Sequence, residues 1–193
     1  MELEPTFATG EEATPSLYLG SIGKINPFFF CLGKETHVGE YYEGFSAASL
    51  VAHVNLMLEG NPAYADSLSG VCYPPFGCMR QVDLRREYSA TIMTRAFAFY
   101  SYLTVSKLPR RILEELRGIA EEALRRAVDQ YGRNASAFGE TCGFAFSPRT
   151  WTPRVMTFEE LEAQGRAHLG DRYEAFAEAA LQEAPEGSDE RLR

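Results

Sequence analysis

The sequence has few of the features that mark membrane, secreted or disulfide-bonded proteins. No apolar run approaches the roughly 20 residues that a membrane-spanning helix needs. Residues 1–5 are acidic, whereas a signal peptide begins with a basic region. Four cysteines in a chain of 193 residues do not make a disulfide framework. We therefore expect a cytoplasmic protein that does not contact membranes and whose thiols are free.

Several catalytic and nucleotide-binding motifs are also absent. Neither G-x-x-x-x-G-K-[ST] nor G-x-G-x-x-G occurs, so no phosphate-binding loop is visible, and the lack of a G-x-S-x-G elbow disfavours a standard serine hydrolase. The chain is acidic, with 27 acidic and 19 basic residues. Because general nucleic-acid binding relies on neutralising phosphates with basic side chains, we expect no nucleic-acid partner.

What is present is the composition of an ordinary globular protein, 45% hydrophobic and 24% charged. At this length one domain is the default, and the chain is long enough to form a core. Polar, proline- and glycine-containing ends predict a flexible lead-in over residues 1–15 and a polar tail over 185–193. The stretch between them, residues 16–184, is predicted to be a single α+β domain.

Two segments have the three- and four-residue apolar spacing of helices. Residues 45–58 are apolar over most of their surface, which predicts a buried helix that stops at Gly60. Residues 109–131 combine an apolar stripe with pairs of opposite charge four residues apart, and Gly132 fits the left-handed position after a helix. A helical turn is also expected over residues 63–68. Thr157 and Glu160 form a capping box that predicts a C-terminal helix.

Short apolar or alternating segments predict strands at residues 16–22, 28–32, 79–85 and 135–146, and a strand that begins at residue 71 and breaks at Pro74 and Pro75. Residues 88–105 are rich in aromatic and β-branched side chains, which favours a strand, with a buried helix as the alternative. The resulting order of strand, helix, strand, strand, helix and strand is that of a ferredoxin-like split β-α-β sandwich. We therefore predict an α+β fold of this arrangement with an additional C-terminal helix.

The segment over residues 33–44 gathers side chains that can transfer protons or bind metal. It contains His37 and Glu40, three residues apart, and Glu43. Imidazole and carboxylate groups serve as general acids or bases and as metal ligands, so His37 and Glu40 are candidate catalytic residues. His53, on the predicted buried helix, is a candidate ligand-binding residue and a further metal ligand. The plainer alternative for the 33–44 segment is a solvated loop, and for His53 it is a hydrogen-bonded histidine in the core. The sequence does not identify a metal.

A second candidate group surrounds the turn between Cys72 and Cys78. The intervening Pro-Pro-Phe-Gly predicts a rigid turn, or a bulge at the rim of a pocket. Cys78 is a candidate nucleophile, although a thiolate needs a neighbouring base or cation. Arg80 is a candidate for binding an anion, and ion pairing with Asp83 and Glu87 is the alternative. Tyr88 and Trp151 complete the ligand-binding candidates. A cluster of all four cysteines, with a redox or iron–sulfur role, is a third hypothesis.

The aromatic residues of the segment 88–105 alternate in a way that assigns them to two faces. Phe97 and Phe99 fall on one face of the predicted strand, and Tyr100 and Tyr102 fall on the other. One face must meet the helices. The other face needs a partner, which is either a second subunit or an apolar ligand.

These patterns support two main hypotheses. The first is a soluble small-molecule-binding protein, potentially an enzyme acting on an anionic or aromatic substrate, with its pocket between the sheet, the 33–44 segment and the 72–80 turn. The second is a non-catalytic homo-oligomeric scaffold or accessory subunit that uses the aromatic sheet face for protein contacts. The sequence decides neither whether the protein is an enzyme nor which cofactor it uses.

Overall fold

The computed structural model describes residues 21–84, 89–143 and 149–182, in two compact units, Met1–Pro153 and Arg154–Arg193. Helices and strands both occur in the first unit, which confirms an α+β protein. The boundary between the two units falls within residues 16–184, which were predicted to form one domain. That prediction stays untested. The predicted lead-in and tail lie outside the described residues, as does Tyr88.

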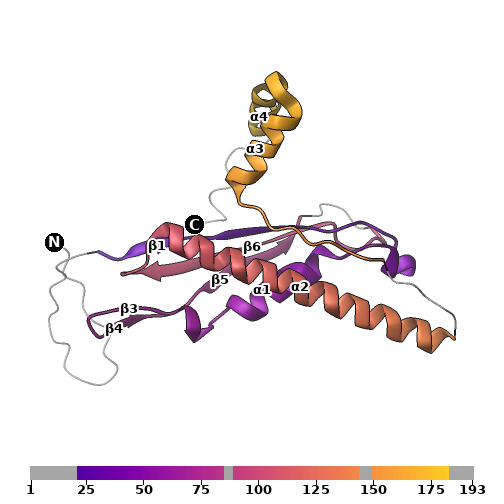
Figure 1. The fold of residues 1–193 in the computed structure, drawn as a ribbon, viewed down its shortest axis with the longest axis horizontal. Helices are drawn as coiled ribbons and strands as arrows, with labels where there is room; N and C mark the ends of the chain where they lie inside the picture. The colour runs from indigo at the N-terminus through magenta and orange to yellow at the C-terminus, as the bar shows by residue number, and fades with distance from the viewer. Residues whose placement is uncertain (1–20, 85–88, 144–148, 183–193) are drawn as a thin grey trace. The chain divides into compact units, whose positions relative to one another are not determined.

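The sheet of the first unit is built around one long strand, β6 (Arg95–Thr104). β1 (Gly23–Ile25) and β2 (Phe28–Leu32) follow one another along one side of β6, and β5 (Gly77–Asp83) pairs along the other side (Figure 1). Both β2 and β5 are antiparallel to β6, so they run parallel to each other with β6 between them. Helix α1 (Ala47–Leu58) lies between β2 and β5 in the sequence.

The strand prediction for residues 88–105 is confirmed over β6, and the helix alternative is wrong there. Along β6 burial alternates with a period of two, as it does in a strand with one covered face. Tyr100 and Tyr102 are fully buried, and Phe76 stacks on Tyr102 with ring centroids 4.1 Å apart. Phe97 and Phe99 face the opposite way and are half-buried.

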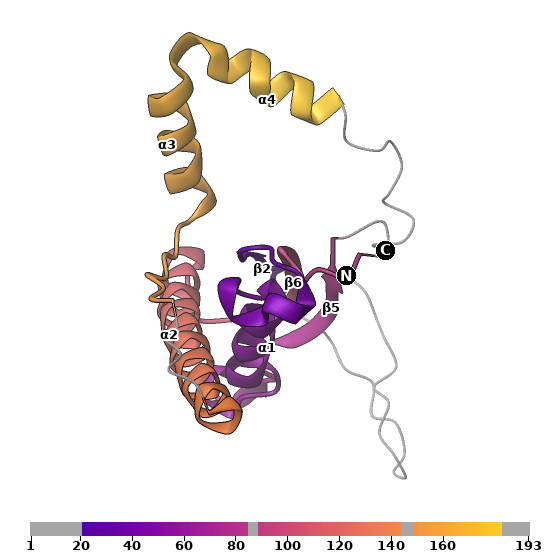
Figure 2. The same cartoon turned by 90° about the vertical axis from the view of Figure 1, so that its right-hand side faces the viewer.

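Both helices of the first unit lie on the same side of the sheet. α1 packs on β2 and β6, and α2 (Pro109–Cys142) packs on α1 (Figure 2). The helix predicted over residues 45–58 is therefore confirmed in α1. Its buried residues are Ala47, Leu50, Val51, Val54 and Leu58.

The predicted end of the second helix at residue 131 and the predicted strand over 135–146 need correction. α2 continues through residues 135–142 and ends at Gly143, whose φ of 70° is left-handed. Ala135 and Gly139 continue the buried stripe of Tyr131 at four-residue spacing. This continued burial outweighs the cost of about 1 kcal/mol for a helical glycine at Gly132. Residues 144–146 of the predicted strand lie outside the described residues.

The connection between α1 and β5 differs from the prediction of a helical turn over residues 63–68. A short 3-10 helix, η2 (Pro62–Tyr64), is followed by the hairpin of β3 (Asp66–Leu68) and β4 (Val71–Tyr73). Ser69 and Gly70 form its turn with φ values of 51° and 82°, the positive pair that a tight two-residue hairpin requires. The prediction of a strand that begins at residue 71 and breaks at Pro74 and Pro75 is confirmed, because β4 ends at Tyr73.

The described part of the second unit contains the helices α3 (Phe158–Leu169) and α4 (Tyr173–Gln182), joined by the 3-10 helix η3 (Gly170–Arg172). The predicted capping box is confirmed, because the Thr157 side chain accepts from the Glu160 backbone N–H and the Glu160 carboxylate accepts from that of Thr157. In the part of the chain that the structure describes, no helix has the length and hydropathy needed to cross a membrane.

Candidate functional site

The open face of the sheet is the side of β2, β6 and β5 that α1 and α2 do not cover. On β2, Phe28, Phe30 and Leu32 point to this side and are 58%, 49% and 65% exposed. Phe29 and Cys31 of the same strand point to the helices. The prediction that residues 28–32 form a strand is confirmed, but the interpretation of that strand as buried is wrong for its alternate residues. The run is apolar throughout, so it lacks the polar alternation that reveals a half-exposed strand.

The strand register brings the aromatic residues of the open face together. Phe28 pairs with Phe99, and Phe30 pairs with Phe97, whose ring also lies 5.4 Å from that of Phe28. On the other side of β6, Val82 pairs with Phe97. These five side chains form a continuous apolar patch across three strands.

Basic side chains lie at the edges of this patch. Arg80 pairs with Phe99 across β5 and β6, and its guanidinium lies 5.7 Å from the centroid of the Phe97 ring. A bulge between Cys78 and Arg80 shifts the register, so Cys78 pairs with Tyr100 and faces the helices while Arg80 faces outward. Arg95 stands at the end of β6 and is exposed. The open face is therefore apolar at its centre and positively charged at its margin.

The 33–44 segment, which contains the 3-10 helix η1 (Val38–Glu43), lies beyond the end of β2. It is held through a bridge between His37 and Thr91 and a hydrogen bond from the Thr91 hydroxyl to the Glu35 carboxylate, 2.6 Å long. His37 Nδ1 accepts a hydrogen bond from the backbone N–H of Gly39 at 3.0 Å. A neutral imidazole in this arrangement carries its proton on Nε2. The exposed ring of His37 therefore presents an N–H donor outward.

The structure does not bring all of the predicted site residues together. His37 and Glu40 are exposed on η1 and its N-terminal end, next to Thr91, whereas Cys78 pairs with Tyr100. Nine positions separate Thr91 and Tyr100, which corresponds to as much as about 30 Å of extended chain. The 33–44 segment and the 72–80 turn thus lie toward opposite ends of β6.

Cys78 itself lies in surroundings that disfavour a thiolate. Its backbone N–H donates to the Glu59 carboxylate at 2.5 Å. Burial and the neighbouring negative charge of Glu59 raise the pKa of the Cys78 thiol. A nucleophilic cysteine needs a lowered pKa, so the geometry gives Cys78 no activation.

The remaining ligand-binding candidates have structural contacts. His53 is half-buried on α1, and its Nδ1 donates to the Ser49 carbonyl at 2.7 Å. Trp151 packs edge-on against Phe45 and Tyr131, with ring centroids 5.6 Å and 6.0 Å away. Its indole Nε1 is buried and has no hydrogen-bond partner among the described residues. Within those residues, no group of three or more histidine, cysteine, aspartate or glutamate side chains is placed to hold a metal ion.

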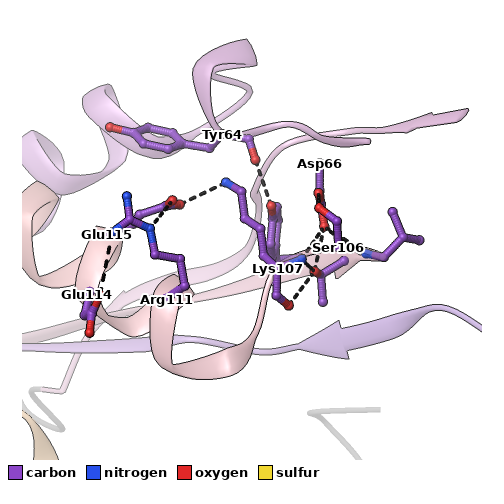
Figure 3. A network of polar contacts seen from close by, with 10 residues as sticks. Tyr64, Asp66, Ser106, Lys107, Arg111, Glu114 and Glu115 are labelled. Atoms are coloured by element: carbon purple, nitrogen blue, oxygen red, sulfur yellow. Dashed lines mark hydrogen bonds and ion pairs between the residues drawn. The ribbon is translucent and has the colours of Figure 1, made fainter. Parts of the chain in front are cut away.

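The most developed polar network surrounds Asp66, a residue that the sequence patterns do not single out. Asp66 is 2% exposed, and its Oδ2 accepts from the Thr104 hydroxyl and from the backbone N–H groups of Val105, Ser106 and Lys107 at 2.7–3.2 Å (Figure 3). The Ser106 hydroxyl donates to its other oxygen. The network ties the hairpin of β3 and β4 to the end of β6, so its role is structural.

The chain is similar to two curated proteins, but these similarities do not assign it to a family. No protein-family model and no solved structure matches the chain. The chain is similar to the Uncharacterized protein YqjN of Bacillus subtilis (strain 168), with 31% identity over 153 residues, 79% of this chain and 28% of that protein. It is also similar to Protein RocB of the same organism, with 20% identity over 149 residues, 77% of this chain and 26% of that protein. The chain spans about a quarter of the length of these curated relatives.

Proposed function

We propose that this chain is a non-catalytic protein-contact unit, a homo-oligomeric scaffold or accessory subunit that binds protein through the open sheet face. The observation that carries the proposal is the exposure of Phe28, Phe30 and Leu32, about half or more of each side chain, on a single face. Contiguous exposed apolar patches of this kind mark interaction sites on soluble proteins. Aromatic residues and arginine are also the side chains enriched in the core of protein interfaces.

A protein partner fits this face better than a small molecule does. Small ligands are held in concave pockets that bury most of their surface. The patch of Phe28, Phe30, Phe97, Phe99 and Val82 instead extends across three adjacent strands. A second sheet or a helix laid across the strands would bury all five side chains together.

We also propose that the fold has the ferredoxin-like arrangement and that the protein is cytoplasmic. The placement of β6 between β2 and β5, with α1 connecting the two outer strands, supports the split β-α-β half of that arrangement. A fourth strand along the outer edge of β1 and β2 would complete it. The free cysteines Cys31, Cys72, Cys78 and Cys142 are consistent with the reducing cytoplasm.

Hydroxyl-radical footprinting of the native assembly tests whether protein covers the open face. We expect Phe28 and Phe30 to be oxidised several-fold more slowly than their exposed fractions of 58% and 49% imply. Phe158 of α3, which is 77% exposed, is the internal control. Oxidation of Phe28 and Phe30 in proportion to those fractions, at every protein concentration, would overturn the proposal.

The held ring of His37 supports a second candidate function, small-molecule binding at the 33–44 segment. The Gly39 N–H fixes which ring nitrogen carries the proton, and an outward N–H donor suits an anionic group. Glu40 would serve there as the proton-transferring carboxylate. Ligand titrations followed by NMR should show a chemical-shift change at His37 and weaker binding in His37→Ala. The matched variant His168→Ala should bind normally, and equal binding by all three proteins would exclude this site.

A further inference from the structure

We infer that the partner on the open sheet face is a second copy of this chain, packed sheet on sheet about a two-fold axis parallel to β6. In this arrangement Arg80 of each copy lies over the aromatic ring of Phe28 of the other. The inference rests on the proposed function of the open face and adds the identity and orientation of its partner.

The strand register supplies the first argument. Phe28 and Arg80 both pair with Phe99, from opposite sides of β6, so the three residues form one row across the sheet. Phe30, Phe97 and Val82 form the next row in the same way. Each row therefore has an aromatic residue on the β2 side and a residue that is not aromatic on the β5 side.

Two-fold symmetry makes these rows self-complementary. A symmetric dimer uses the same patch on both copies, so each side chain must suit its symmetry mate. An axis parallel to β6 exchanges the two sides of a row and places Arg80 over the partner's Phe28, a cation–ring contact. Arg80 already packs in this manner on Phe97 within its own chain. The same axis places Phe30 against the partner's Val82 and Phe99 against the partner's Phe99.

The alternative in-plane axis, perpendicular to the strands, is disfavoured by charge where it passes through the Arg80 row. An axis perpendicular to the strands keeps the β5 side over the partner's β5 side, and one that passes through the Arg80 row would place Arg80 against the partner's Arg80 and Phe28 against the partner's Phe28. Like charges that face each other in an interface are unfavourable. With the axis parallel to β6, Arg95 does face its own mate, but it stands at the exposed end of the strand. There its long side chain can extend into solvent.

The size of the face predicts a weak dimer. Ten residues of β6 span about 33 Å, and three strands span about 14 Å, so the flat footprint is on the order of 460 Å² per copy. Two copies then bury roughly 900 Å² in total, without the additional area that protruding side chains contribute. Interfaces of this size are weak and transient. Dimerisation should therefore be weak and should depend on protein concentration.

Sedimentation velocity of the full chain over a concentration series measures the association. We expect the wild type to change from monomer to dimer. Arg80→Glu should raise the dissociation constant about tenfold or more, because two symmetric cation–ring contacts are lost. Phe28→Ser should do the same, whereas Arg133→Glu, the same charge change at an exposed position of α2, should leave the constant unchanged. Circular dichroism melting of every variant confirms that it is folded.

Cross-linking determines the axis. In a Cys72→Ser, Cys142→Ser background, a copy with Val82→Cys is mixed with a copy with Phe30→Cys, and a short bismaleimide is added. An axis parallel to β6 predicts a covalent dimer from the mixture and little from either variant alone. Efficient cross-linking of each variant to itself would instead indicate the perpendicular axis and overturn the inference.

The outcomes separate this inference from the proposed function. If the chain is monomeric and Phe28 and Phe30 are oxidised freely, both fall. If footprinting shows both residues protected while sedimentation shows a monomer bound to a different protein, the contact function stands and the second copy is wrong. A dimer that Arg80→Glu and Phe28→Ser leave intact would place the interface elsewhere and overturn the inference.

Discussion

Asp66 is the buried carboxylate on which the β3–β4 hairpin and the end of β6 converge. Burial by itself raises the pKa of a carboxyl group. Here the hydrogen bonds from Ser106, Thr104 and Val105 outweigh burial and hold the pKa of Asp66 far below its usual range. The charged form therefore stabilises the folded chain, and the hairpin depends on it.

Replacing Asp66 by Asn should lower the free energy of unfolding by about 2–3 kcal/mol near neutral pH, because buried N–H donors lose a charged acceptor. Chemical denaturation measures the change, and Asp129→Asn on the exposed surface of α2 is the control. Since the folded pKa is depressed, the contribution of Asp66 is complete above its unfolded pKa of about 4 and is lost as pH falls below it. The wild type and Asp66→Asn should therefore converge in acid; a constant difference down to pH 2 would contradict this account.

The cysteine thiols differ in burial and are therefore expected to differ in reactivity. Burial raises the pKa of Cys31 to about 12, and the side chain faces the helices, whereas Cys72 and Cys142 are exposed. Because the thiolate is the reactive form, Cys31 should not react with an aromatic disulfide reagent at pH 8 in the folded protein. Cys72 and Cys142 should react within minutes, and mass spectrometry of the labelled peptides distinguishes the sites. Labelling of Cys31 at the same rate would show that its strand opens readily.

At the scale of elements, sequence patterns were most informative where one face of an element is buried throughout. The alternation of Phe97, Phe99, Tyr100 and Tyr102 predicts β6 and both of its faces, and the capping box predicts the start of α3 at Thr157. The end of α2 could not be predicted, because Gly132 resembles a stop signal. Only the packing surface shows that Ala135 continues the buried stripe beyond that glycine.

Two glycines differ in the space around them, and replacing each by alanine tests whether the chain passes close to another segment at that position. A Cβ at Gly33, where the chain leaves β2, would lie 2.1 Å from the Phe45 carbonyl oxygen, but at Gly118 in α2 it would meet nothing within 4 Å. Gly33→Ala should therefore destabilise the fold by about 1–3 kcal/mol. Gly118→Ala should stabilise it by about 0.5–1 kcal/mol, because alanine loses less backbone entropy in a helix. Thermal unfolding of both variants measures the opposite signs, and a neutral Gly33→Ala would contradict the close approach.

At the scale of the whole chain, the main feature is a sheet in the first unit that α1 and α2 cover on one face. If a second copy covers the other face, binding linkage makes the melting temperature rise with protein concentration. We expect this rise for the wild type and its loss in the double variant Phe28→Ser, Phe30→Ser, measured by calorimetry from micromolar to millimolar protein. A melting temperature that does not depend on concentration in either protein would argue against self-association through this face.

Sequence patterns correctly predicted the α+β content, the central strand and its two faces, and the helices beside it. These follow from local periodicity, because side chains two apart on a strand and three or four apart on a helix share a side. The tertiary structure was needed to show which face the helices cover and that β2 exposes Phe28, Phe30 and Leu32. It alone placed His37 and Cys78 toward opposite ends of the sheet and gave Asp66 its donors. Burial and hydrogen bonding between residues distant in the chain depend on strand pairing, and no local pattern encodes that pairing.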